Sequence, residues 1–141
     1  MVIVRISETA QAAGVGVETV RFYERRGLIE QPAKPTFGGH RRYPNETVER
    51  IRFIRRSQGI GFSLREIGEL LSLRVDPEAD CSVALGHTQD KLAEVDRKIA
   101  SLQAIKAALE VLVQNCPGRG AISKCSIIDA LATADESVEL A

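Results

Sequence analysis

Apolar side chains recur with a helical period in two short stretches near the start of the chain, residues 6–13 and 17–26. Ser7 stands where the first helix needs an N-cap, and Gly14 stands where that helix should end. The second helix is expected to begin at about Val17 and to stop at Gly27. Two short helices joined through a glycine turn are typical of a helix-turn-helix, whose second helix can enter the major groove of DNA.

The second predicted helix carries side chains suited to binding a nucleic acid. Its cationic residues Arg21, Arg25 and Arg26 offer guanidinium forks for phosphates or guanine edges. The adjacent rings of Phe22 and Tyr23 can pack against the DNA backbone.

The segment that follows, residues 31–44, should form a small basic wing. Pro32 and Pro35 prevent a long helix, and the pair Gly38 and Gly39 suits a hairpin tip before an extended stretch over residues 40–43. His40 is interpreted as a turn residue beside this wing.

Two further helices complete the first half of the chain. The third is expected over residues 46–58 after a capping Asn45, and the fourth over residues 64–73 after a capping box formed by Ser63 and Glu66. The apolar residues of the third helix should face inward; they are Val48, Ile51, Phe53 and Ile54. Its arginines should face water or phosphate; they are Arg50, Arg52, Arg55 and Arg56. The pattern predicts a mainly α winged helix-turn-helix domain over residues 1–75.

Residues 81–115 contain no proline and show a heptad repeat that predicts one long helix. The two seam series are Leu85, Leu92, Ile99, Lys106 and Val113, and Thr88, Val95, Leu102 and Leu109. A rod of about 50 Å with a narrow apolar stripe is not stable unpaired. We therefore expect an antiparallel coiled coil with a second copy of the chain.

Three cysteines lie near the ends of this rod. Cys81 begins the helix and Cys116 ends it, so within one chain they should be about 50 Å apart. In an antiparallel dimer centred between residues 98 and 99, Cys81 would face Cys116 of the other copy. Cys125 precedes a short predicted helix over residues 126–132, whose dipole should favour its thiolate. Three thiolates can then converge, two from one chain and one from the other.

Such a site favours a large, soft ion. Structural zinc takes four ligands, and catalytic zinc takes three ligands and water, often with histidine. Three sulfurs without a nearby histidine favour mercury(II) over zinc. His87, six residues after Cys81, is interpreted as a surface or seam residue.

Composition and charge support this organisation. The chain has 141 residues, 44% of them hydrophobic, and a net charge of zero. Residues 1–75 hold 13 basic and 8 acidic side chains, whereas residues 76–141 hold 6 and 11, so the halves carry +5 and −5. A positive first half suits a polyanion such as DNA. With no signal peptide and no long apolar run, the chain is expected in the cytoplasm rather than in a membrane.

Four motifs in order resemble the MerR family of bacterial transcription regulators. They are ETAQAAGVGVETVRFYERRGLI, GGHRRY, RIRFIRRSQGIGFSLREIGELL and, after the long helix, CPGRGAISKC. Within this family, a cysteine at the start of the dimerisation helix together with two in the terminal loop is similar to the mercury-responsive members. The segments are then residues 1–75 for DNA binding, 76–115 for linker and dimerisation helix, 116–134 for metal-binding loop and short helix, and 135–141 for the tail.

The resemblance implies a function and residue roles. The protein would be a homodimer that binds its double-stranded promoter, represses without metal, and activates RNA polymerase by distorting the DNA when Hg(II) is bound. Arg21 and Tyr23 match recognition-helix contacts, and Arg41 with its neighbour Arg42 matches the wing contact. The three mercury ligands would be Cys81, Cys116 and Cys125.

Three alternatives remain at this point. A zinc, cadmium or lead sensor of the same family could use the same cysteines. A thiol-disulfide switch would respond to oxidant, although the chain contains no Cys-x-x-Cys. A thiol enzyme would need a base near its nucleophile, and the two histidines form no such arrangement, so we do not expect an enzyme.

Overall fold

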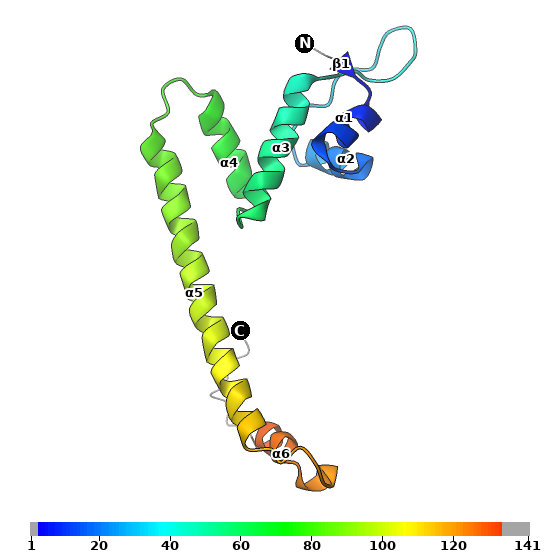
Figure 1. The fold of residues 1–141 in the computed structure, drawn as a ribbon. Coiled ribbons are helices and arrows are strands. Elements are labelled where there is room, and N and C mark those ends of the chain that lie inside the picture. The colour runs from blue at the N-terminus through cyan, green and yellow to red at the C-terminus, as the bar shows by residue number, and fades with distance from the viewer. Residues whose placement is uncertain (1–2, 134–141) are drawn as a thin grey trace. The chain divides into compact units, whose positions relative to one another are not determined.

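The computed structural model describes residues 3–133 and is mainly helical, as predicted (Figure 1). Two compact units divide within the long helix, between His87 and Thr88. The elements in chain order are β1 (Ile3–Val4), α1 (Ile6–Ala13), α2 (Val17–Arg25), β2 (Tyr43–Pro44), α3 (Asn45–Gly59), α4 (Leu64–Val75), α5 (Cys81–Gln114), the 3-10 helix η1 (Ile122–Lys124) and α6 (Ser126–Ala132).

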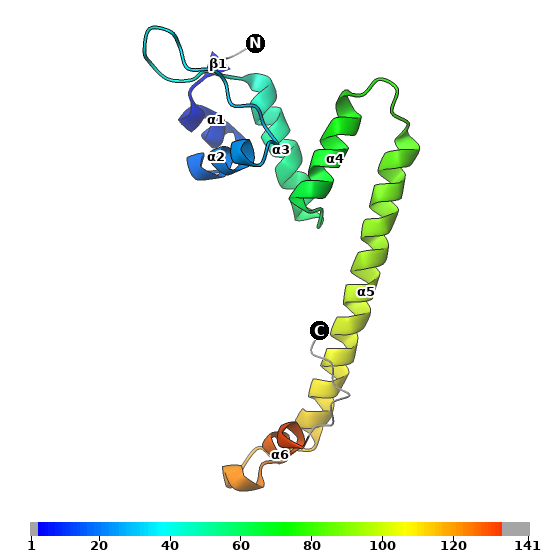
Figure 2. The same cartoon turned by 180° about the vertical axis from the view of Figure 1, so that it is seen from behind.

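The core of the first unit lies where α1 packs against α2 and α3, and where α4 packs against α3 (Figure 2). Val20 of α2, Ile51 and Ile54 of α3, and Ile67 of α4 are completely buried. The inward-facing residues of the third helix were thus predicted correctly for Val48, Ile51 and Ile54, and Phe53 is partly buried. This core holds α2 in a fixed position within the unit.

The turn between α1 and α2 forms as expected, but the start of α1 does not. Gly14 adopts a left-handed conformation with φ 73°, and its N–H donates to the carbonyl of Gln11 at 3.1 Å. Glycine reaches this conformation without the steric cost that a Cβ would bring. The prediction that Ser7 caps α1 is wrong, because Ser7 lies inside the helix and Arg5 occupies the cap position without a side-chain hydrogen bond.

The wing differs from the predicted hairpin. Gly38 and Gly39 do form its turn, with φ of 80° and 102°. However, the extended residues Tyr43–Pro44 pair antiparallel with Ile3–Val4 at the start of the chain, and the arm before the glycines, residues 30–35, contains no strand. The wing is therefore a loop that one strand pairing, distant in sequence, fastens to the unit.

Of the caps predicted for α3 and α4, the first is wrong and the second is confirmed. Asn45 is the first residue of α3 rather than its cap, and the cap position belongs to Pro44. The capping box of α4 is confirmed: the Glu66 N–H donates to Ser63 Oγ at 3.2 Å, and the Ser63 N–H donates to Glu66 Oε1 at 2.8 Å. These reciprocal bonds satisfy two amides that a helix start leaves unpaired.

The long helix and the last helix form as predicted. Helix α5 begins at Cys81 and ends at Gln114, and α6 begins at Ser126 and ends at Ala132. The predicted tail, residues 135–141, and residue 134 of the predicted metal-binding segment lie outside the described residues. Over residues 3–133, no helix is long and apolar enough to cross a membrane.

Candidate functional site

The exposed face of α2 carries the arginines predicted to contact DNA. The Arg21 side chain is 55% exposed and its guanidinium lies 3.9 Å from the exposed Glu18 carboxylate, so this ion pair holds it weakly. Arg25 and Arg26 are also exposed, and the Arg26 guanidinium lies 5.9 Å from the centre of the Phe22 ring. This face presents guanidinium groups on a helix whose opposite face is anchored in the core.

Tyr23 is placed differently from the other predicted DNA contacts. Its side chain is only 2% exposed, and its hydroxyl donates to Gln58 Oε1 of α3 at 2.8 Å. The ring therefore packs inside the unit and ties α2 to α3. The sequence expectation of a ring presented to the DNA backbone does not describe this side chain as it lies here.

The wing meets α2 at a hydrogen-bonded base. Arg41 is half-buried and its Nε donates to the carbonyl of Pro32 at 2.8 Å, whereas Arg42 is exposed. The Tyr43 hydroxyl donates to the Glu24 carboxylate of α2. Burial, and then this bond to Glu24, raises the pKa of Tyr43 well above its usual value. The hydroxyl thus stays protonated and keeps the wing joined to α2.

A basic hollow lies between α2 and the wing. Its lining includes Arg21 of α2 and Lys34, His40 and Arg41 of the wing. One carboxylate, Glu24, also lines it, but that group already accepts the Tyr43 hydroxyl. Cations from two segments therefore surround one surface depression, which is the arrangement that a phosphate backbone requires.

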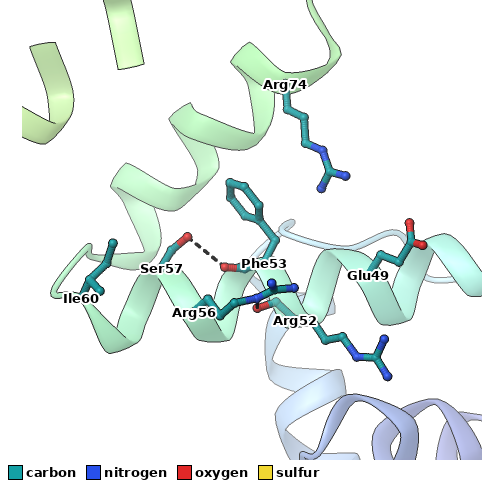
Figure 3. Close-up of a pocket in the computed structure, with 7 residues that line it drawn as sticks. All are labelled: Glu49, Arg52, Phe53, Arg56, Ser57, Ile60 and Arg74. Atoms are coloured by element: carbon teal, nitrogen blue, oxygen red, sulfur yellow. Dashed lines mark hydrogen bonds between the residues drawn. The ribbon is translucent and has the colours of Figure 1, made fainter. Parts of the chain in front are cut away.

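A second arginine cluster, which was not predicted from the sequence, lies on α3 and α4. Figure 3 shows the Phe53 ring between the two helices, with Arg74 on one side and Arg52 and Arg56 on the other. The Arg74 guanidinium is 5.5 Å from the Phe53 ring centre, within range of a cation–π contact. The i,i+4 spacing of Arg52 and Arg56 was visible in the sequence. The position of Arg74 beside Phe53, however, depends on the packing of α4 on α3.

Two arginines of α3 bind backbone carbonyls outside their own helix instead of facing only water or phosphate. Arg50 Nε donates to the carbonyl of Leu28 at 2.5 Å, and Arg52 Nη2 donates to the carbonyl of Ala12 at 2.8 Å. Both carbonyls follow or end a helix of the helix-turn-helix, where acceptors lack intrahelical partners. These arginines therefore contribute to holding α1 and α2 against α3.

The cysteines fall into a pair and a single residue. Cys116 and Cys125 are both half-buried in the second unit, and the Cys116 side chain lies close enough to Cys125 to help lower the pKa of its thiol. Cys81 is exposed at the first position of α5, and Asp80 before it accepts the Ser82 N–H at 2.8 Å as an N-cap does. This cap was not among those predicted from the sequence. In the described part of the chain, no three metal-binding side chains come together.

The pKa of the Cys125 thiol lies below its ordinary value. Backbone N–H groups of Ile128 and then Ile127, at the start of α6, donate to its sulfur, and the Cys116 thiol adds a smaller contribution. The predicted stabilisation of this thiolate by the short helix is confirmed in direction. Ser126 Oγ donates to the carbonyl of Asn115 at 2.9 Å, which fastens the start of α6 to the end of α5.

Comparison with known proteins identifies the family. The model described as "MerR HTH family regulatory protein" matches residues 4–73, and the one described as "MerR, DNA binding" matches residues 48–112. A mercuric resistance operon regulatory protein of Bacillus cereus is 42% identical over 127 residues, covering 90% of this chain and 96% of that protein. The chain belongs to the MerR family of transcription regulators.

Other MerR-family proteins are similarly close. The HTH-type transcriptional regulator ZntR of Escherichia coli K12 is 41% identical and covers 90% of this chain and 91% of its own. The transcription regulator PbrR691 of Ralstonia metallidurans CH34, solved in complex with lead(II), has a TM-score of 0.82 at 35% identity, covering 91% of this chain and 98% of its own. The regulator MerR of Bacillus megaterium MB1, solved with mercury(II), has a TM-score of 0.70 at 38% identity, covering 92% and 99%.

Proposed function

We propose that this MerR-family protein is a mercury(II)-responsive transcription regulator that works as a homodimer on its promoter in the cytoplasm. The observation that carries the proposal is the Cys116–Cys125 pair, in which one sulfur already has a lowered pKa. Thiolates, not thiols, bind soft metal ions. The pair would supply two of the three thiolate ligands proposed for Hg(II).

The third ligand would be the partner's Cys81. Helix α5 separates Cys81 from Cys116 by about 50 Å within one chain. Apolar seam residues along the helix are exposed in the single chain, among them Leu92 at 61% and Leu102 at 64%. An antiparallel partner helix would cover this seam and bring its own Cys81 to the other chain's pair.

DNA binding would use the exposed cations of the first unit. Arg21 would contact the major groove or its phosphates from α2, and Arg41 and Arg42 would contact phosphates from the wing. Because Tyr23 is buried, we assign it the role of positioning α2 through its bond to Gln58.

Metal binding would stabilise one conformation of the dimer over another. Without it the dimer represses; with three thiolates bound to Hg(II), the two DNA-binding domains would favour a distorted promoter that RNA polymerase can open. Distorting DNA costs on the order of 1–6 kcal/mol. Metal–thiolate bonding that favours one conformation over the other can supply a bias of that size.

Lead(II) is the second candidate for the ion, since the relative with TM-score 0.82 was solved with lead(II). Zinc and cadmium sensing remain alternatives that use the same cysteines. Three sulfurs suit both soft ions, and the titration that follows separates them.

The test is a competition titration of the dimer with Hg(II), Pb(II), Cd(II) and Zn(II) against excess small thiol, followed by thiolate-to-metal charge-transfer absorption. We expect only Hg(II) to saturate the site, and Cys81→Ala, Cys116→Ala and Cys125→Ala each to abolish activation of in vitro transcription while promoter binding persists. Saturation by Pb(II) instead would identify lead(II), rather than mercury(II), as the ion that the protein senses. Activation at low mercury by any one of the single variants would refute the three-thiolate site.

Arg21→Ala provides the complementary variant. It should weaken specific promoter binding and leave the metal-to-dimer ratio unchanged, because Arg21 and the cysteine pair lie in different units. Loss of metal binding in this variant would contradict the separation of the two functions.

A further inference from the structure

The Phe37 ring is the most exposed large apolar side chain of the described residues. Its exposed fraction is 100%, whereas the next most exposed, Ile122, is at 73%. Phe37 lies in the wing, in the turn that Gly38 and Gly39 complete. An uncovered ring at a loop tip contributes nothing to the core, and it is fully accessible to a partner outside the chain.

The wing holds this ring away from the helices on a fastened base. In both views the loop between α2 and β2 extends away from the helices of the first unit (Figures 1 and 2). Three interactions fasten its base: the Arg41–Pro32 hydrogen bond, the Tyr43–Glu24 hydrogen bond, and the pairing of β2 with β1. Less conformational entropy is then lost when the tip binds a partner, because the base is already ordered.

The chemistry around the ring indicates the partner. Lys34, His40, Arg41 and Arg42 flank it along the loop, and no acidic residue lies between Gln31 and Tyr43. Three of these, together with Arg21 of α2, line the basic hollow at the base of the wing. A basic surface with one apolar ring suits a polyanion that also offers apolar atoms, which describes the sugar edges of duplex DNA.

We propose that Phe37 is a DNA-contact residue whose ring packs against deoxyribose atoms in the minor groove beside the major groove that α2 enters. A segment beside a recognition helix can reach the adjacent minor groove, as the N-terminal arm of a homeodomain does. Apolar side chains are inserted there by several classes of DNA-binding protein. The inference rests on the proposed promoter binding and adds a contact to it.

The first test uses fluorescence, because the chain has no tryptophan. In Phe37→Trp the single indole should emit as water-exposed in the free protein. Its emission should shift to the blue, and its quenching by acrylamide should fall, on addition of the duplex that the wild-type protein protects in a footprint. The matched control is Val75→Trp, at a position 72% exposed at the end of α4, where the same duplex should change neither signal.

The second test measures affinity. Phe37→Ser should weaken binding to the same duplex about tenfold, the loss expected when the burial of one aromatic ring is removed. The slope of log Kd against log salt should not change, because no charge is removed. Phe37→Leu should restore most of the affinity.

Three results would overturn the proposal: unchanged emission of Phe37→Trp on DNA, unchanged affinity of Phe37→Ser, or an emission change that appears only when RNA polymerase is added. The absence of any footprint with the wild-type protein would instead refute the proposed function. The two failures are therefore distinguishable.

Discussion

Leu102 offers a quantitative test of the dimer. It lies in the predicted seam of α5, and 64% of its side chain is exposed in the single chain. Full burial of a leucine contributes about 2 kcal/mol, so covering the exposed part contributes a little over 1 kcal/mol. A two-fold dimer contains this residue twice. Leu102→Ala should therefore cost about 2.5 kcal/mol of association free energy and raise the dimer dissociation constant by roughly fifty- to a hundredfold.

Sedimentation equilibrium over a range of protein concentrations measures this constant. Val111→Ala is the control, since Val111 is 53% exposed on the same helix but belongs to neither seam series. The control should leave the constant within a few-fold of wild type. Equal effects of both substitutions, or a wild-type chain that stays monomeric at micromolar concentration, would refute the assigned seam and with it the position proposed for Cys81.

Three further predictions concern the DNA-binding unit. Ser63→Ala should lose about 1 kcal/mol of unfolding free energy with the capping box, whereas Ser7→Ala should be neutral; equal losses in thermal melts would mean that Ser7 does cap α1. Gly14→Ala should cost about 1 kcal/mol, because φ is 73° there, and urea unfolding that shows no loss would contradict the left-handed turn. The raised pKa of Tyr43 favours the protonated form in the folded state, so the contribution of Tyr43 to the free energy of unfolding is fully present below pH 10.0, the usual pKa, and declines as pH rises above that value. Tyr43→Phe should remove this decline. If the unfolding free energies of wild type and variant ran parallel with pH, the hydroxyl would not be buried as described.

Local signals predicted most of the helices. The bounds of α6 match the prediction, and those of α5 match within one residue at its end, because a heptad pattern, a terminating proline and a short apolar run are properties of neighbouring residues. The two failed caps, Ser7 and Asn45, show the limit of this reasoning. Each is a good capping residue, but α1 begins two residues earlier than a cap at Ser7 would place it, and α3 begins one residue earlier than a cap at Asn45 would place it.

The candidate sites also contain features that the sequence could predict and features that it could not. The three cysteines and the exposed arginines of α2 could be selected from residue type and spacing. The burial of Tyr23 could not, because its partner Gln58 is 35 positions away on α3. Nor could the Arg74–Phe53 contact, which exists only because α4 packs against α3.

The sequence by itself determined the order of the helices, the extent of the long helix and which residues are candidates for binding DNA or a soft metal, since periodicity and side-chain chemistry act over a few residues. Only the tertiary structure decided that β2 pairs with β1, and that Arg50 and Arg52 of α3 bind the backbone carbonyls of Leu28 and Ala12. These features depend on contacts between distant segments, whose free energy no local pattern contains.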